Sequence, residues 1–191
     1  MTVTSEYLCD AQPLKEEWGS TEESRSGATK LQGYTPPGKG EFILFVDNDD
    51  SWLWIGQRIL SRLGYRMVGY SSPAGALNFF RMQPTCFDLV ITDLNMPEVD
   101  GLEFVARLKQ YRPDVPIIMI TSSEIGDLRE IHKLGIQRLV PKHEVGSSLG
   151  KIIEGVLEEY RASGRSDRPL LCTLSARVQS GGSFTLSRTW R

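Results

Sequence analysis

The sequence has few of the residues that build metal–thiolate sites, disulfide frameworks or membrane segments. Its 191 residues include only three cysteines and two histidines. Cys9, Cys86 and Cys172 match no metal-binding spacing, and their odd number and wide separation fit no disulfide framework, so we expect a reducing, cytoplasmic setting. The longest apolar runs, such as FILFV and PIIMI, are far shorter than the ~20 residues of a membrane span.

Neither sign of charge is in large excess. The formal net charge is −2, which predicts no general attraction to nucleic acids or to membrane surfaces. The N-terminal stretch MTVTSEYLCDAQPLKEE lacks the basic start and apolar segment of a secretion signal. The content of 40% hydrophobic and 24% charged residues is typical of a soluble globular protein.

Composition divides the chain into three parts. Residues 1–40, rich in Gly, Ser and Pro, are expected to be a flexible extension. Residues 41–160 hold nearly all the strong periodicity and are expected to form one domain. Residues 161–191 form a basic tail, too short for a typical DNA-reading module. Apolar and polar residues of the tail alternate on both sides of SGG, as in a β-hairpin. Because an isolated hairpin is only marginally stable in water, we expect the tail to be disordered.

Strand-like and helix-like segments alternate five times between residues 41 and 160. Continuous apolar runs predict strands at 42–46, 66–70, 88–92, 115–120 and 137–140. Helical spacing predicts helices at 53–64, 73–80, 101–111 and 124–135, and around 152–157. Strands that are apolar on both faces indicate a parallel sheet covered on each side, so the predicted fold is a doubly wound α/β fold.

Polar side chains follow four of the predicted strands. They are Asp47, Asn48, Asp49 and Asp50 after the first strand, Asp93 and Asn95 after the third, Thr121 after the fourth, and Lys142 after the fifth. Ligands of such sheets bind outside the carboxyl ends of the strands, so we expect these side chains to converge there.

This set of groups suits metal and phosphate chemistry. Clustered carboxylates favour Mg²⁺, which takes one or two of them together with carbonyl and phosphate oxygens. A lysine supplies a compact positive charge for a phosphate-like anion, and a threonine hydroxyl can contact its oxygens. A rigidly presented Asp93 could then act as a nucleophile toward phosphorus.

Each residue taken alone also has an ordinary structural explanation. Asp49 and Asp50 are suited to cap the first helix, and Asp100 the third. Thr121 alone would be a capping hydroxyl, and Lys142 alone a solvated surface lysine. The two histidines, His132 and His143, are expected to be exposed rather than to bind a ligand or donate phosphate. Only the coincidence of four strand ends favours a functional site.

Residues ~41–160 resemble the receiver domain of two-component response regulators. The motifs that carry the resemblance are ILFVDNDD, LGIQRLVPK, PIIMITSSE and, most specifically, DLVITDLNMPEVDGLEF. The resemblance implies a flavodoxin-like sheet of five parallel strands in the order 2-1-3-4-5. It also implies a phosphorelay in which a sensor histidine kinase or a phosphotransfer protein passes a phosphoryl group to Asp93, forming an aspartyl phosphate.

The same resemblance implies roles for the other residues at the strand ends. The implied Mg²⁺ ligands are Asp47, Asn48, Asp93 and the backbone carbonyl of Asn95. Thr121 and Lys142 would contact the phosphoryl group.

The sequence departs from the family pattern at three positions. Asn48 stands where the second acid of the metal-binding pair is usual; its amide oxygen can bind a metal but brings no charge. Leu139 stands three residues before the lysine, where the family usually has an aromatic switch residue. His143 follows Lys142 where a proline is usual, and Pro141 precedes the lysine instead, as an edge strand tolerates.

These features give one leading functional hypothesis and two alternatives. The leading hypothesis is a stand-alone receiver, not a dedicated enzyme, that signals by contact with an unidentified downstream protein. The first alternative is a pseudo-receiver, the same fold acting as a phosphorylation-independent scaffold. A carboxylate-nucleophile phosphatase is disfavoured, because Asn95 stands where a second catalytic acid would be needed.

Overall fold

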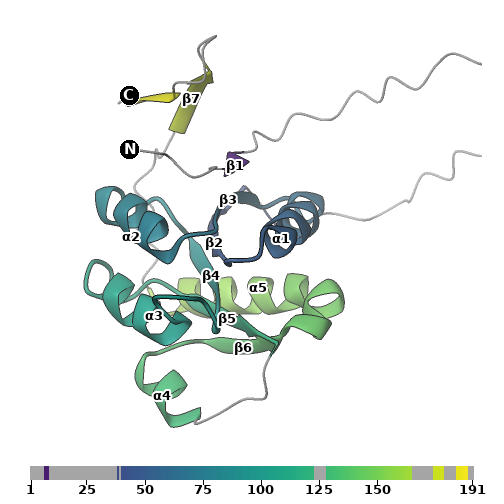
Figure 1. Ribbon diagram of the computed structural model, residues 1–191. Helices are drawn as coiled ribbons and strands as arrows, with labels where there is room; N and C mark the ends of the chain where they lie inside the picture. The colour runs from purple at the N-terminus through teal and green to yellow at the C-terminus, as the bar shows by residue number, and fades with distance from the viewer. Residues whose placement is uncertain are drawn as a thin grey trace, which may run out of the picture.

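A computed structural model of the protein describes residues 7–8, 38, 40–122, 128–164, 174–178 and 184–188. One sheet organises the fold, with strand order β1-β3-β2-β4-β5-β6 (Figure 1). Its strands are β1 Tyr7–Leu8, β2 Phe42–Val46, β3 Arg66–Tyr70, β4 Leu89–Asp93, β5 Ile117–Thr121 and β6 Arg138–Pro141. The helices are α1 Asp50–Arg62, α2 Pro73–Met82, α3 Gly101–Lys109, α4 Leu128–Lys133, the short 3-10 helix η1 Lys142–Glu144, and α5 Val145–Ala162.

The parallel part of the sheet has the predicted topology. Strands β2 to β6 pair in parallel in the order β3-β2-β4-β5-β6. This is the predicted 2-1-3-4-5 arrangement, with β2 counted as the first strand. The predicted doubly wound α/β fold is therefore confirmed. Pro141 closes β6, the edge strand, where a missing backbone N–H is tolerated.

The terminal extensions contain strands of their own. β1 pairs antiparallel with β3 at the other edge of the sheet, matching Tyr7 with Gly69 and Leu8 with Val68. In the C-terminal tail, β7 (Leu174–Val178) pairs antiparallel with β8 (Phe184–Arg188). At these residues the structure has the hairpin that sequence analysis ranked below disorder. The other tail residues beyond 164, and most of the N-terminal extension, lie outside the described residues.

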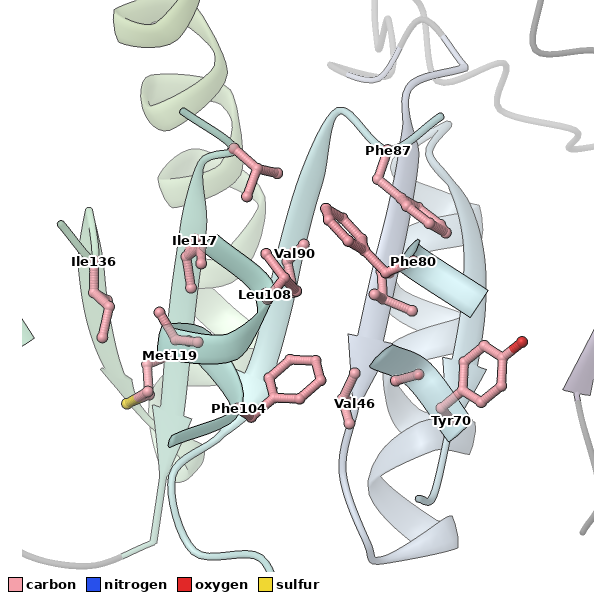
Figure 2. Close-up of a cluster of buried hydrophobic side chains, with 14 of the residues drawn as sticks. Val46, Tyr70, Phe80, Phe87, Val90, Phe104, Leu108, Ile117, Met119 and Ile136 are labelled. Atoms are coloured by element: carbon pink, nitrogen blue, oxygen red, sulfur yellow. The ribbon is translucent and has the colours of Figure 1, made fainter. Parts of the chain in front are cut away.

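The two faces of the sheet bury separate apolar cores. Alternate β2 residues Leu44 and Val46 pack with Phe80 of α2 and Phe104 of α3, in the cluster that Figure 2 shows. The other β2 residues, Ile43 and Phe45, face the second cluster. Its side chains from α1 and α5 are Leu53, Leu60, Val145, Leu149, Ile153, Val156 and Leu157. This two-sided burial explains why the strands read as continuous apolar runs.

Capping residues set where the helices begin. Ser72 accepts a hydrogen bond from the Gly75 backbone N–H, and Pro73 occupies the first turn, as predicted. Asp49 accepts from the Ser51 N–H and Asp100 from the Glu103 N–H, which confirms both as caps. These two acids therefore organise the loops that follow Asp47 and Asp93.

The cysteine expectation was wrong in one respect. Cys86 is disulfide-bonded, whereas the sequence fitted no disulfide framework. An odd count and wide spacing in sequence carry no information about which sulfur atoms approach each other in space.

No helix within the described ranges combines the length and hydropathy that a bilayer crossing requires.

Candidate functional site

Four buried polar residues meet at the carboxyl ends of the parallel strands. Asp47 follows β2, Asp93 and Thr121 end β4 and β5, and Lys142 follows β6. Their exposed fractions are 0%, 4%, 1% and 7%. Because β2, β4, β5 and β6 are consecutive in the sheet, the four side chains gather along its carboxyl-terminal end. We call Asp47, Asp93, Thr121 and Lys142 the acid pocket.

Lys142 is the charge partner of both carboxylates. Its Nζ lies 2.8 Å from Asp47 Oδ2 and 3.3 Å from Asp93 Oδ2. Burial raises the pKa of the Asp47 carboxyl above its ordinary value, while hydrogen bonding to Lys142 and to the Asp49 backbone partly offsets that rise. Buried charges require this kind of pairing, and breaking it by removing one partner is strongly destabilising.

The carboxylate oxygens of the pocket are not equally engaged. Asp47 Oδ1 accepts a hydrogen bond from the Asp49 backbone N–H at 2.9 Å. Asp93 Oδ1 is buried and has no hydrogen-bond partner among the residues that the structure describes. Unsatisfied buried acceptors are uncommon in native proteins, so this oxygen marks the point where a cation or an electrophile would be received.

The two asparagines stand in the loops that follow Asp47 and Asp93. Asn48 and Asn95 are exposed. The Asn95 Nδ2 donates a hydrogen bond to Thr121 Oγ1 at 3.3 Å, which joins the loop after β4 to the end of β5. The pairing of Asn95 with Thr121 did not follow from the sequence motifs.

The donor set fits a hard divalent cation that keeps several waters. Within the described ranges, no group of three or more His, Cys, Asp or Glu side chains gathers as a metal site. The pocket instead offers the carboxylates of Asp47 and Asp93, and Asn48 and Asn95 stand in the loops that follow them. One or two carboxylates with neutral oxygens is the composition that Mg²⁺ accepts.

The loop after β4 folds back tightly on the strand end. The Leu94 N–H donates to the Ile120 carbonyl, and the Gly101 N–H donates to the Leu94 carbonyl. Glu98, within this loop, has a φ of 67°, in the left-handed region. The loop therefore fixes the backbone on the C-terminal side of Asp93.

Sequence analysis missed one residue of the site. Trp52, in the first turn of α1, places its ring with the centroid 5.1 Å from Lys142 Nζ. This separation is within the range of cation–π attraction. A large aromatic residue in the helix turn that follows Asp47 was the signal available in the sequence.

The remaining predicted residues lie away from the pocket chemistry. His132 and His143 are exposed, as expected. Leu139 is half-buried and packs against the core cluster on the face of the sheet covered by α2, α3 and α4. Position 139 therefore carries a half-buried aliphatic side chain that packs against the core.

Comparison with known proteins identifies the family. The model of the response regulator receiver domain family matches residues 43–154. The transcriptional regulatory protein GlrR of Escherichia coli is 31% identical over 123 residues, covering 63% of this chain and 27% of that protein. Among the curated relatives that match, the first three share only 19%, 13% and 18% of their length with this chain.

Solved structures share the fold. A CheY-like receiver domain protein from Methanospirillum hungatei has a TM-score of 0.60 at 23% identity, covering 66% of this chain and 100% of that one. TrrA from Thermotoga maritima, solved in complex with Mg²⁺ and BeF, has a TM-score of 0.54 at 24% identity, covering 61% of this chain and 98% of that one. With its family match, its sheet order and its buried pocket of two aspartates and a lysine, this chain belongs to the response regulator receiver domain family.

Proposed function

We propose that Asp93 accepts a phosphoryl group from a sensor histidine kinase or a phosphotransfer protein in a phosphorelay. The observation that carries this proposal is the state of the Asp93 carboxylate: Oδ2 is held by Lys142 at 3.3 Å, and Oδ1 has no hydrogen-bond partner among the described residues. A carboxylate fixed by one oxygen and unengaged at the other is oriented for attack on phosphorus.

The residues of the acid pocket divide the chemistry between them. A carboxylate oxygen of Asp93 bonds to phosphorus while the P–N bond to the donor's imidazole breaks, and the electron pair of that bond goes to the imidazole nitrogen. Lys142 places a positive charge where the phosphoryl oxygens arrive. The hydroxyl of Thr121, at the end of the neighbouring strand, is positioned by Asn95 to contact one of those oxygens. Burial strengthens each of these interactions by excluding water.

Mg²⁺ is the proposed cofactor. Asp47, Asp93, the Asn48 amide and the Asn95 carbonyl would hold it, and when bound it neutralises charge on the transferring phosphoryl group. The complex of TrrA with Mg²⁺ and BeF supports this proposal by family likeness. Because Asn48 contributes no charge, we expect weaker metal binding than a pair of acids would give.

A phosphorylation-independent scaffold is the second candidate. It is favoured by one observation: Lys142 already pairs with both carboxylates, so the resting pocket has little need of a cation. Asn48, an amide where the family usually has an acid, brings no negative charge beside Asp47. Under this alternative, the fold would present a fixed surface to its partner.

We further propose that the domain is not a dedicated enzyme and that its output is contact with another protein rather than with DNA.

A histidine kinase or phosphotransfer donor acts in the cytoplasm, which is the proposed location. Disulfides are rare in the cytosol. The Cys86 disulfide is at odds with this proposed location, and thiol titration with and without reductant measures whether the bond is present.

Incubation with acetyl phosphate and Mg²⁺, followed by intact-mass measurement, tests the proposal. We expect the wild-type protein to gain one phosphoryl group and Asp93→Asn to gain none. Asp50→Asn, which changes an exposed acid just beyond the pocket, is the control and should be labelled like the wild type. Undiminished labelling of Asp93→Asn would exclude Asp93 as the acceptor. A wild-type protein that takes no phosphoryl group would favour the scaffold.

A further inference from the structure

Trp52 completes the surroundings of the buried ammonium group. Lys142 Nζ has Asp47 Oδ2 at 2.8 Å, Asp93 Oδ2 at 3.3 Å and the Trp52 ring centroid at 5.1 Å. The Lys142 side chain is only 7% exposed. The ammonium therefore lies between two anions and an aromatic face, and the residue that supplies the face belongs to a different element from those that supply the charges.

The three contacts have different chemical consequences. The carboxylates attract the ammonium into the pocket, but both are groups that a metal ion or a phosphoryl group would engage. The indole ring attracts the ammonium without competing for either ligand, because a π face is not a ligand of Mg²⁺ or a partner of phosphate. A lysine held in part by the ring keeps its position while its anionic partners change.

We propose that Trp52 is a positioning residue for Lys142: its ring holds the ammonium at the acid pocket and shields it from water. The consequence for phosphorylation rests on the proposed function, whereas the effect on the ammonium itself does not. In the resting protein, loss of the ring should increase the mobility and solvent access of Lys142. During phosphorylation, the same loss should slow the reaction through a less well placed charge.

The chain contains a matched control in the same helix. Trp54 lies two residues further along α1, is 61% exposed, and has Arg58 rather than Lys142 over its ring, at 4.9 Å. Replacement of Trp54 removes an indole and a cation–π contact but touches no group of the pocket. A comparison of the two positions therefore separates the effect on Lys142 from the general cost of losing a tryptophan.

The first experiment measures hydrogen exchange of the Lys142 ammonium by ¹⁵N-detected NMR of the unphosphorylated full chain. For Trp52→Leu and Trp52→Met we expect exchange to be roughly 3- to 30-fold faster than in the wild type, the range that corresponds to cation–π energies. Trp52→Phe and Trp54→Leu should both keep the slow exchange of the wild type. Unchanged exchange in both non-aromatic variants, or equal acceleration in Trp52→Phe, would overturn the proposal. The paired variants keep the test decisive if one of them fails to fold.

The second experiment measures the rate of labelling by acetyl phosphate and Mg²⁺ at matched folded fractions. We expect Trp52→Leu to be labelled more slowly than the wild type, with the rate recovered in Trp52→Phe. If the non-aromatic variants are labelled at the wild-type rate, Trp52 has no positioning role in the reaction and the proposal fails in that part. If the wild type itself is not labelled, the proposed function fails, and the exchange measurement still decides the role of Trp52.

Discussion

Gly101 lies directly against the backbone of Asp93. A Cβ at position 101 would be 2.2 Å from the Asp93 carbonyl oxygen and 2.8 Å from the Leu94 Cα. Both are backbone atoms, so no side-chain rotation can relieve the clash. Gly101→Ala should therefore lower the free energy of unfolding by roughly 1–3 kcal/mol, as measured by urea denaturation. In Gly146→Ala of α5, where nothing lies within 4 Å of the added Cβ, stability should be unchanged or higher. Equal losses at the two sites would contradict this account.

Glu98 occupies a backbone conformation that favours glycine. Its φ of 67° places a side chain in the left-handed region, and the residue is exposed. Glu98→Gly should raise the free energy of unfolding by up to ~1 kcal/mol, since relief of the Cβ strain exceeds the added entropy of the unfolded chain. Glu154→Gly, on an exposed position of α5, should lower it by about 1 kcal/mol. A lower thermal midpoint for Glu98→Gly would refute the strain argument.

Asn48 should limit the affinity for Mg²⁺. Asn48→Asp adds a carboxylate next to Asp47 and should tighten Mg²⁺ binding by about tenfold or less, because desolvation offsets much of the added attraction. Calorimetric titration measures the change. Gln57→Glu adds the same charge further along α1 and is the control. An unchanged or weaker affinity in Asn48→Asp would remove this residue from the metal site.

The phosphorylation signal is expected to leave through α4, β6 and α5. Thr121 and Lys142 end β5 and follow β6, so any displacement of them passes to the segments that come next. Leu139 packs against the core and has no hydroxyl to exchange partners, which predicts a coupling near the lower end of ~1–3 kcal/mol. Chemical-shift mapping with beryllofluoride should show changes at exposed positions such as Lys133 and Lys151. Changes confined to the acid pocket would instead support the scaffold.

Asp114 makes stability depend on pH at the opposite end of β5. Burial alone would raise the pKa of Asp114, but the hydrogen bond from Tyr160 and the charge of Arg112 outweigh it and lower the pKa below 3.8. The stabilisation is therefore fully present well above the ordinary pKa of 3.8 and is lost as the pH falls through the lower folded-state pKa.

Asp114→Asn should accordingly lower the free energy of unfolding at pH 7, by about 1 kcal/mol or less because the side chain is 40% exposed. The difference from the wild type should close in acid. Denaturation at pH 7 and below pH 3 measures both ends. In a Tyr160→Phe background the effect should shrink, since the donor to Asp114 is gone. A difference that persists in acid would contradict the assignment to the carboxylate.

The sequence predicted the sheet well because burial on both faces leaves a direct pattern. The runs at 42–46 and 66–70 match β2 and β3 residue for residue, and Ser72-Pro73 marked the start of α2. Motif resemblance placed Asp93, which ends β4. Predicted boundaries differed where a strand ran on into functional or edge residues, as at Thr121 and Pro141.

What the sequence did not predict depends on contacts between distant segments. The approach of Trp52 to Lys142 joins α1 to η1, and the hydrogen bond from Asn95 to Thr121 joins the loop after β4 to the end of β5. The role of Gly101 was hidden because the same Asp-Gly step is explained fully by a helix cap. Neither periodicity nor local motif reports such pairs, because both describe neighbours along the chain.

The burial of Lys142 with Asp47 and Asp93 also determines how the domain responds to ionic strength. Dissolved ions screen charges that face water and have little effect on pairs that are almost fully enclosed. The internal charge balance of the pocket is therefore set by the protein's own ammonium and stays the same in dilute and concentrated salt. Under the proposed function, the encounter with a phosphoryl donor would take place across exposed surface, where attraction between opposite charges weakens as salt is added. Salt concentration would thus change the rate of that encounter while leaving the ion pairs of Lys142 with Asp47 and Asp93 in place.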